Sequence, residues 1–318
     1  MKISAGNKVI ALIMGLTLLI GMMGCTPQQQ KKPVPRKMIT EPTISLFVNE
    51  TGQVKKLKME DYIQGVVAAE MDTDWPVNAL AAQAILARTF TLKQIKDKGG
   101  VPKHKTDAST SVEEFQAYDS AKINDNVRKA VALTRGEVVI YKGEYINAWF
   151  SACDGGVEAS AAEGLAYRKE QTPYIKAGVK DGCLSITPPE NRRWTASFPV
   201  QTVRAAVQKT MGQDPGSITG ANVSVAKRGP TGRAENLKIG KVTVGAAALR
   251  LALGNDKMRS IYIDNITVSN GKVVMSGKGY GHGVGMCQWG AKKMSTQGKS
   301  PEDIIRFYFK DISVNKIW

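Results

Sequence analysis

The sequence predicts an α+β fold, and three observations lead to this prediction. A strand-like hairpin opens the folded part at residues 44–59, two strongly apolar helical segments follow at residues 59–71 and 76–98, and strand-like pieces alternate with a short helix over residues 221–275. The chain has 318 residues, of which 42% are hydrophobic, so it can bury one large core or two modest ones. We expect a mixed, sheet-containing catalytic body with packed helices.

Residues 1–24 have the pattern of a secretory signal peptide, with a basic start and an apolar run at residues 9–23 that is short for a spanning helix. The stretch MMGC, Met22–Cys25, resembles a bacterial lipobox, in which cleavage leaves a lipid-carrying Cys25. An uncleaved N-terminal anchor and an ordinary signal peptide are the alternatives. All three possibilities place the folded body outside the cytoplasmic membrane. We expect it to be anchored to the outer face of that membrane.

Residues 25–41 consist largely of Gln, Pro and Lys, with little to bury, and predict a flexible tether. The folded domain is expected over residues 42–318. Its first hairpin turns at Asn49–Gly52. The first helix ends before Pro76, which disfavours helix in the preceding residue, and the second ends at a Gly-Gly pair, Gly99 and Gly100.

The later elements are shorter. A hairpin with its turn at Lys142–Glu144 runs into a loop containing Gly155 and Gly156, and residues 193–212 read as a strand followed by a helix. The stretch QWGA, Gln288–Ala291, leads into the helix that packs the C-terminus. A last helix begins after Ser300, which is a good N-cap and is followed by proline.

The net charge is +16, and +14 remains after removal of residues 1–24, which contain Lys2 and Lys8. A basic field outside a membrane attracts wall polymers and lipid head groups rather than nucleic acid. A solvated basic surface without a partner explains the charge equally well.

If Cys25 carries lipid, the cysteines left are Cys153, Cys183 and Cys287. An odd number leaves one thiol over after one disulfide. We expect a disulfide between Cys153 and Cys183, because the exported compartment favours it. A zinc site from the three cysteines with His282 or His104 has suitable ligand types, but no CxxC or HxxxH pair supports it.

Three further groups of residues are candidates for catalysis or binding. Cys287 and His282 are five residues apart, but spacing alone does not make a nucleophile and base, and the surrounding glycines indicate crowded backbone. Glu70, Asp72 and Asp74 end an apolar helix, where a carboxyl group out of water would be a general acid with a raised pKa, or simply part of a solvated turn. Arg88 and Gln83, in the Ala-rich second helix, belong either to a core network or to a substrate-facing edge.

Five blocks resemble, in order, those of the stage II sporulation protein D family, which includes amidase-enhancer domains. They are YIQGVVAAEM with ALAAQAILARTFTL, AWFSACDGGVEAS, PYIKAGVKD, and GYGHGVGMCQWGAKKMSTQGKSPEDIIRFYF, and they extend over about residues 42–315. The resemblance implies a lytic transglycosylase acting on peptidoglycan glycan strands, in wall remodelling and sporulation. A non-catalytic wall-binding enhancer of a cell-wall amidase is the alternative.

The resemblance also assigns roles. The AAEM block places the catalytic glutamate at Glu70, and the ART block places a substrate-binding arginine at Arg88. Lys180, His282 and Gln288 are expected to bind substrate, the last two as part of a groove wall. Some relatives bind zinc with Cys and His near the glycine loop, but the histidines are missing there, so no cofactor is predicted.

Overall fold

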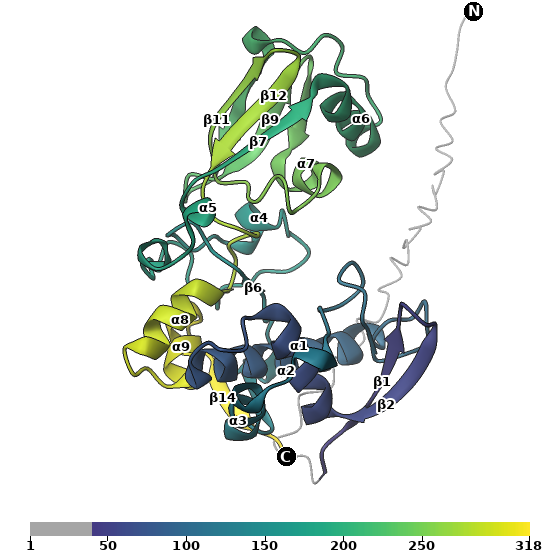
Figure 1. Ribbon diagram of the computed structural model, residues 1–318, viewed down its shortest axis with the longest axis vertical. Helices are drawn as coiled ribbons and strands as arrows, with labels where there is room; N and C mark the ends of the chain where they lie inside the picture. Colours follow the sequence, from purple (N-terminus) through teal and green to yellow (C-terminus); the bar gives the residue numbers. More distant parts are fainter. Residues whose placement is uncertain (1–39) are drawn as a thin grey trace, which may run out of the picture. The chain divides into compact units, whose positions relative to one another are not determined.

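The computed structural model describes residues 40–318, and the fold begins with a hairpin beside two helices (Figure 1). Strands β1 (Thr43–Val48) and β2 (Gln53–Lys58) pair antiparallel, and β3 (Ala108–Ser109) pairs parallel with β1. The predicted signal peptide, Cys25 and nearly all of the tether lie outside the described residues.

Helices α1 (Met59–Glu70) and α2 (Val77–Lys98) form the centre of the first core. The small side chains of the Ala-rich α2 let neighbouring elements approach closely, which is why most of this helix is buried. Gly99 ends it in the left-handed conformation, with φ of 71°. Helix α3 (Asp125–Leu133), capped by Asn124, packs on both helices and was not predicted from the sequence.

Short strands and helices complete this core. Strand β4 pairs antiparallel with β5 and with the C-terminal β14, and β6 pairs parallel with β13. The elements are β4 (Glu137–Tyr141), β5 (Glu144–Tyr145), β6 (Phe150–Ser151), α4 (Ala161–Gly164), β13 (Met286–Cys287), α8 (Gln288–Thr296), α9 (Pro301–Tyr308), β14 (Ser313–Lys316) and the 3₁₀ turns η1 (Ser120–Lys122) and η2 (Cys183–Ser185).

A second core is built from the residues between η2 and β13. Two three-stranded antiparallel sheets, β11-β12-β7 and β10-β9-β8, pack with α6 and α7, as Figure 1 shows. The elements are α5 (Pro189–Arg192), β7 (Trp194–Pro199), α6 (Val200–Met211), η3 (Gly220–Asn222), β8 (Val223–Arg228), β9 (Ala234–Ile239), β10 (Val242–Gly245), α7 (Ala246–Leu253), β11 (Ile263–Ser269) and β12 (Lys272–Gly277).

Hydrogen bonds join the two cores. Glu163, near the end of α4, accepts from the backbone N–H and the hydroxyl of Thr231. The predicted α+β class is confirmed, as are the first hairpin, the helices at α1, α2, α8 and α9, and the strand-helix pair β7-α6. Residues 40–318 contain no helix long and apolar enough to cross a membrane.

Candidate functional site

Glu70 is the last residue of α1, and its side chain is half-buried beneath the segment that follows β3. One carboxylate oxygen, Oε1, accepts the backbone N–H of Ala117 at 2.9 Å. The same segment is held against α1 by a second bond, from the N–H of Asp119 to the carbonyl of Gly65. The carboxyl group is thus positioned by the chain around it while part of it remains accessible.

Burial raises the pKa of Glu70, and the Ala117 N–H, which stabilises the charged form, only partly offsets this. Asp72 and Asp74 are exposed, and neither is among the causes of the shift. The charges of these two residues therefore do not account for the raised pKa of Glu70. Asp72 instead caps the local turn by accepting the N–H of Asp74.

Gln288, the first residue of α8, contacts the backbone of Glu70. Its Nε2 donates to the Glu70 carbonyl oxygen at 3.2 Å and to Oε1 of Gln83 at 3.4 Å. Gln288 is buried, so the structure gives it a positioning role instead of the expected sugar contact. Gln83, which the sequence left between core and edge, belongs to this buried network.

Two tryptophans that were not predicted as site residues lie next to this contact. Trp75 follows Glu70 by five positions and Trp289 follows Gln288 directly, and their ring centroids are 4.6 Å apart. The ammonium of Lys292 lies over both rings, at 4.7 and 4.6 Å from their centroids. Two of the chain's five tryptophans are close in sequence to expected site residues, and this proximity could have predicted that they belong to the site.

Arg88 lies in the core and is not placed to bind a substrate. Its side chain is 0% exposed, and it donates to both carboxylate oxygens of Glu60, at 3.2 and 2.6 Å, and to the carbonyl of Glu137. A sugar contact would require this buried pair to break, which costs several kcal/mol. The structure therefore corrects the expected role of Arg88 from binding to structural.

The two remaining expected binding residues, Lys180 and His282, follow and precede residues that hydrogen-bond to the same short segment, Glu158 and Ala159. Lys180 is exposed and precedes Asp181, whose carboxylate accepts the hydroxyl of Tyr308 in α9. His282 lies in the loop between β12 and β13, where burial and the charges of Arg250 and Arg233 lower its pKa to about 3. Its Nδ1 accepts the N–H of Val284, so His282 stabilises the loop as a neutral side chain.

Comparisons with known proteins match both parts of the described chain. A model of the stage II sporulation protein family matches residues 48–141, and one of a domain family of unknown function matches residues 187–285. An uncharacterised protein of Brachyspira hyodysenteriae is 32% identical over 264 residues, which cover 82% of this chain and 67% of that protein. The stage II sporulation protein D of Bacillus amyloliquefaciens is 28% identical over 306 residues, 92% of this chain and 82% of that protein. The chain belongs to the stage II sporulation protein D family.

A further relative of this family member is the amidase enhancer of Bacillus subtilis, which is 27% identical over 289 residues. The match covers 78% of this chain and 39% of the enhancer. The stretch matched by the sporulation protein model contains Glu70 and Arg88, whereas Lys180, His282 and Gln288 lie outside it.

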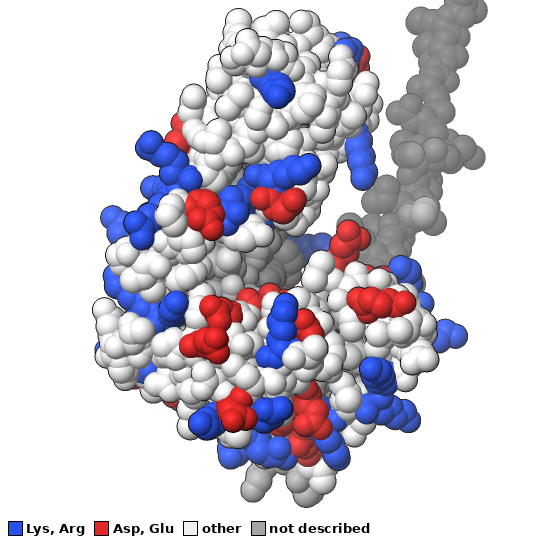
Figure 2. All heavy atoms as spheres, in the orientation of Figure 1, with Lys and Arg blue, Asp and Glu red and all other residues white. Residues whose placement is uncertain are grey.

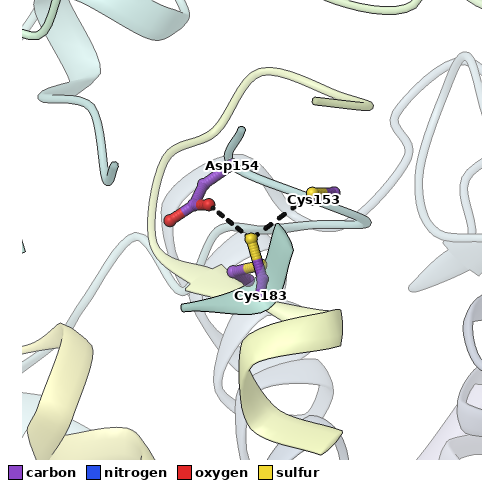
Figure 3. A group of neighbouring side chains, drawn as sticks. Cys153, Asp154 and Cys183 are labelled. Atoms are coloured by element: carbon purple, nitrogen blue, oxygen red, sulfur yellow. Dashed lines mark hydrogen bonds between the residues drawn. The ribbon is translucent and has the colours of Figure 1, made fainter. Parts of the chain in front are cut away.

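The three cysteines of the described residues come together in this family member, as free thiols. The sulfurs of Cys153 and Cys183 are 3.5 Å apart (Figure 3), and Cys287 and Asp154 complete a group whose candidate ligand atoms lie within 4.8 Å of one another. Neither His282 nor His104 belongs to this group. The disulfide stays a prediction.

Cys287 has the environment of a structural residue. It is fully buried, burial raises the pKa of its thiol, and its sulfur accepts the N–H of Gly290 as the cap of α8. An enclosed thiol whose pKa is raised in this way is a poor nucleophile.

Basic and acidic side chains are interspersed over the first core on the face shown in Figure 2. On this face the positive charge is therefore not gathered into a single patch. The net charge alone does not identify a partner of this protein.

Proposed function

We propose that this chain is a lytic transglycosylase that cleaves the bonds between N-acetylmuramic acid and N-acetylglucosamine in peptidoglycan glycan strands. The proposal rests on the environment of the Glu70 side chain. One of its oxygens is held by Ala117, the side chain remains partly exposed, and burial raises its pKa. A carboxyl group with a raised pKa keeps a proton nearer to neutral pH, as a general acid must.

The proposed reaction needs only this one carboxyl group. Glu70 gives its proton to the glycosidic oxygen as the bond to the anomeric carbon breaks, so that N-acetylglucosamine leaves with a free hydroxyl. The Glu70 carboxylate then takes the proton of the muramic acid 6-hydroxyl, whose oxygen bonds to the anomeric carbon and closes a 1,6-anhydro ring. Glu70 ends protonated, as it began, and no water is consumed.

The neighbouring side chains suit a glycan. Trp75 and Trp289 offer aromatic surface of the kind that packs on sugar rings, although Trp75 is only 7% exposed, so Trp289 would make the larger contact. Lys292 and the exposed Lys180 would attract the lactyl carboxylate that is freed when stem peptides are removed. The proposed substrate is therefore glycan stripped of its peptides.

Product analysis tests this proposal. Purified full-length protein is incubated with intact and with amidase-treated walls, and the products are identified by mass spectrometry. We expect anhydro-ended glycan, more of it from amidase-treated walls, and a loss of at least about 100-fold in rate for Glu70→Gln. Asp72→Asn, a carboxyl-to-amide change at an exposed neighbour, is the control and keeps its activity. Reducing ends in place of anhydro ends would show a hydrolase.

The second candidate is a non-catalytic enhancer of a cell-wall amidase, which the name of one relative favours. It predicts that Glu70→Gln binds walls and stimulates the amidase as well as the wild type does. A binding module has no need of a half-buried carboxyl group with a raised pKa, which supports the enzyme.

We also propose that the protein is held at the outer face of the cell membrane by lipid on Cys25. Mature protein isolated from cells should then begin at Cys25 and carry the mass of the lipid, and Cys25→Ser should release the protein from the membrane. Unmodified mature protein that begins elsewhere would contradict the anchor without affecting the proposed activity.

A further inference from the structure

The cysteine cluster brings together ligand atoms from three distant segments of the chain. Cys153 and Asp154 follow β6, Cys183 begins η2, and Cys287 ends β13. All four residues are buried, and their three sulfurs and one carboxylate oxygen lie within 4.8 Å of one another. A disulfide would use two of these sulfurs, so it does not account for the convergence of all four side chains.

The distances suit one tetrahedral ion. Zn–S bonds of about 2.3 Å place two sulfurs about 3.8 Å apart at the tetrahedral angle. The Cys153 and Cys183 sulfurs are 3.5 Å apart, and the Cys183 sulfur is 3.1 Å from Oδ1 of Asp154, as Figure 3 shows. Shifts of less than about 1 Å would bring all four atoms to bonding distance of a shared centre.

Asp154 provides a second, independent observation. Its side chain is turned toward Cys183 (Figure 3), the residue is 1% exposed, and its Oδ2 has no hydrogen-bond partner among residues 40–318. A buried carboxylate oxygen without a partner is costly. Oδ1, the oxygen that faces Cys183, accepts from the Cys183 thiol and from the N–H of Gly156, so a cation held by this oxygen would lower the cost of burying the carboxyl group.

Other buried charged groups surround the cluster. Two more buried carboxyl groups, those of Glu158 and Asp181, lie within electrostatic range of Asp154. Arg233, the buried cation nearby, donates to the backbone carbonyls of Asp154 and Val157 instead of pairing with the Asp154 carboxylate. Because zinc binding releases three thiol protons, the occupied site would be one unit more negative than the thiols and carboxylate alone, and the buried Arg233 guanidinium would offset part of that charge.

We propose that Cys153, Cys183, Cys287 and Asp154 bind one Zn²⁺ in a structural site. Binding replaces three S–H bonds with three Zn–S bonds and releases three protons, while the carboxylate supplies the fourth ligand without redox change. Thiolate ligands in a group this compact favour zinc over the harder Mg²⁺ and Ca²⁺. Four protein ligands leave no open position, so the ion holds the fold together instead of activating water.

The site would also support the region around Glu70. Cys287 is the residue before Gln288, whose amide holds the Glu70 carbonyl, so the ion would join the start of α8 to the loops that carry Cys153 and Cys183. The zinc proposal does not depend on the proposed glycan chemistry, because the two concern different side chains.

Metal analysis of the full-length protein, purified without chelators, tests the proposal. We expect one zinc per chain by mass spectrometry of the metal content, and X-ray absorption should show three sulfur ligands and one oxygen ligand. Cys183→Ser and Asp154→Asn should each retain less than a tenth of the zinc. The matched control is Cys25→Ser, at the one cysteine outside the cluster, and it should keep a full zinc content.

Two readouts on the wild type keep the test decisive if the variants fail to fold. Zinc removal by a chelator should lower the melting temperature and make three buried thiols reactive, and added zinc should reverse both effects. A chain without zinc whose mass is lower by two hydrogens would show the Cys153–Cys183 disulfide and overturn the proposal. A chain without zinc in which Cys153, Cys183 and Cys287 are free thiols after unfolding would overturn it too, as would full zinc content in Cys183→Ser.

Discussion

The side-chain amide of Gln288 lies 3.2 Å from the backbone carbonyl oxygen of Glu70, and this hydrogen bond joins residues 218 positions apart. Gln288 opens α8 and Glu70 closes α1, so the bond fixes the end of one helix against the start of another. The position of the proposed general acid therefore depends on the C-terminal part of the chain.

Replacing Gln288 should weaken both the fold and the site. In Gln288→Met, the Glu70 carbonyl and the buried Oε1 of Gln83 lose their donor, so the free energy of unfolding should fall by about 1–3 kcal/mol. Denaturant unfolding measures the change. Gln297→Met, at an exposed position just after the same helix, should stay within about 0.5 kcal/mol of the wild type. Equal stability of the two variants would show that the bond contributes nothing.

Glu70→Gln should raise stability at neutral pH. Because the pKa of Glu70 is raised in the folded state, its favourable contribution is complete below the unfolded value of about 4.5 and is lost as the pH rises through the folded value. The amide keeps an oxygen for the Ala117 N–H and carries no charge to bury. Melting temperatures should therefore show a stabilised variant at neutral pH.

The stability difference between Glu70→Gln and the wild type should shrink below pH 4.5, because the Glu70 carboxyl group is then mostly neutral in both the folded and the unfolded protein. Asp72→Asn, at an exposed site, is the matched control and should show no comparable pH-dependent difference. A Glu70→Gln variant that is less stable than the wild type at neutral pH would mean that the carboxylate, not the carboxylic acid, is the form that the fold favours.

Arg88→Met should destabilise the protein by about 3–5 kcal/mol, because it leaves the buried Glu60 carboxylate without its cation. Arg88→Lys should also be destabilising, since an ammonium cannot replace the fork that contacts both Glu60 oxygens and the Glu137 carbonyl. Arg128→Met removes an exposed ion pair with Asp125 and should cost at most about 1 kcal/mol. Normal stability with a raised KM in Arg88→Met would restore the substrate-binding role.

Gly290→Ala should disturb the packing of α8. A Cβ at this position would lie 1.8 Å from Oδ2 of Asp181 and 2.1 Å from the hydroxyl of Tyr308, which are hydrogen-bonded to each other. We expect a loss of about 1–3 kcal/mol in the free energy of unfolding. Gly245→Ala, where nothing lies within 4 Å of the added carbon, is the matched control. An unchanged melting temperature in Gly290→Ala would show that Asp181 can move away without cost.

Local patterns predicted much of the first core. The alternation in β1 and β2, the apolar spacing in α1 and α2, and the proline and glycine signals around them depend on neighbours in sequence, and these elements agree with the structure. Helix α3 and strand β14 were missed. The short β14 forms only by pairing with β4, more than 170 residues earlier, which no local pattern reveals.

The sequence by itself determined the α+β class and the family blocks, and the resemblance of the AAEM block singled out Glu70 as the candidate acid, because these signals depend on residues close together in the chain. Only the tertiary structure decided where longer side chains lie. Arg88 proved to be a buried partner of Glu60, and Gln288 a support for Glu70. The cysteines form one cluster because β6, η2 and β13 meet in space, and such meetings depend on packing between distant segments, which spacing along the chain does not encode.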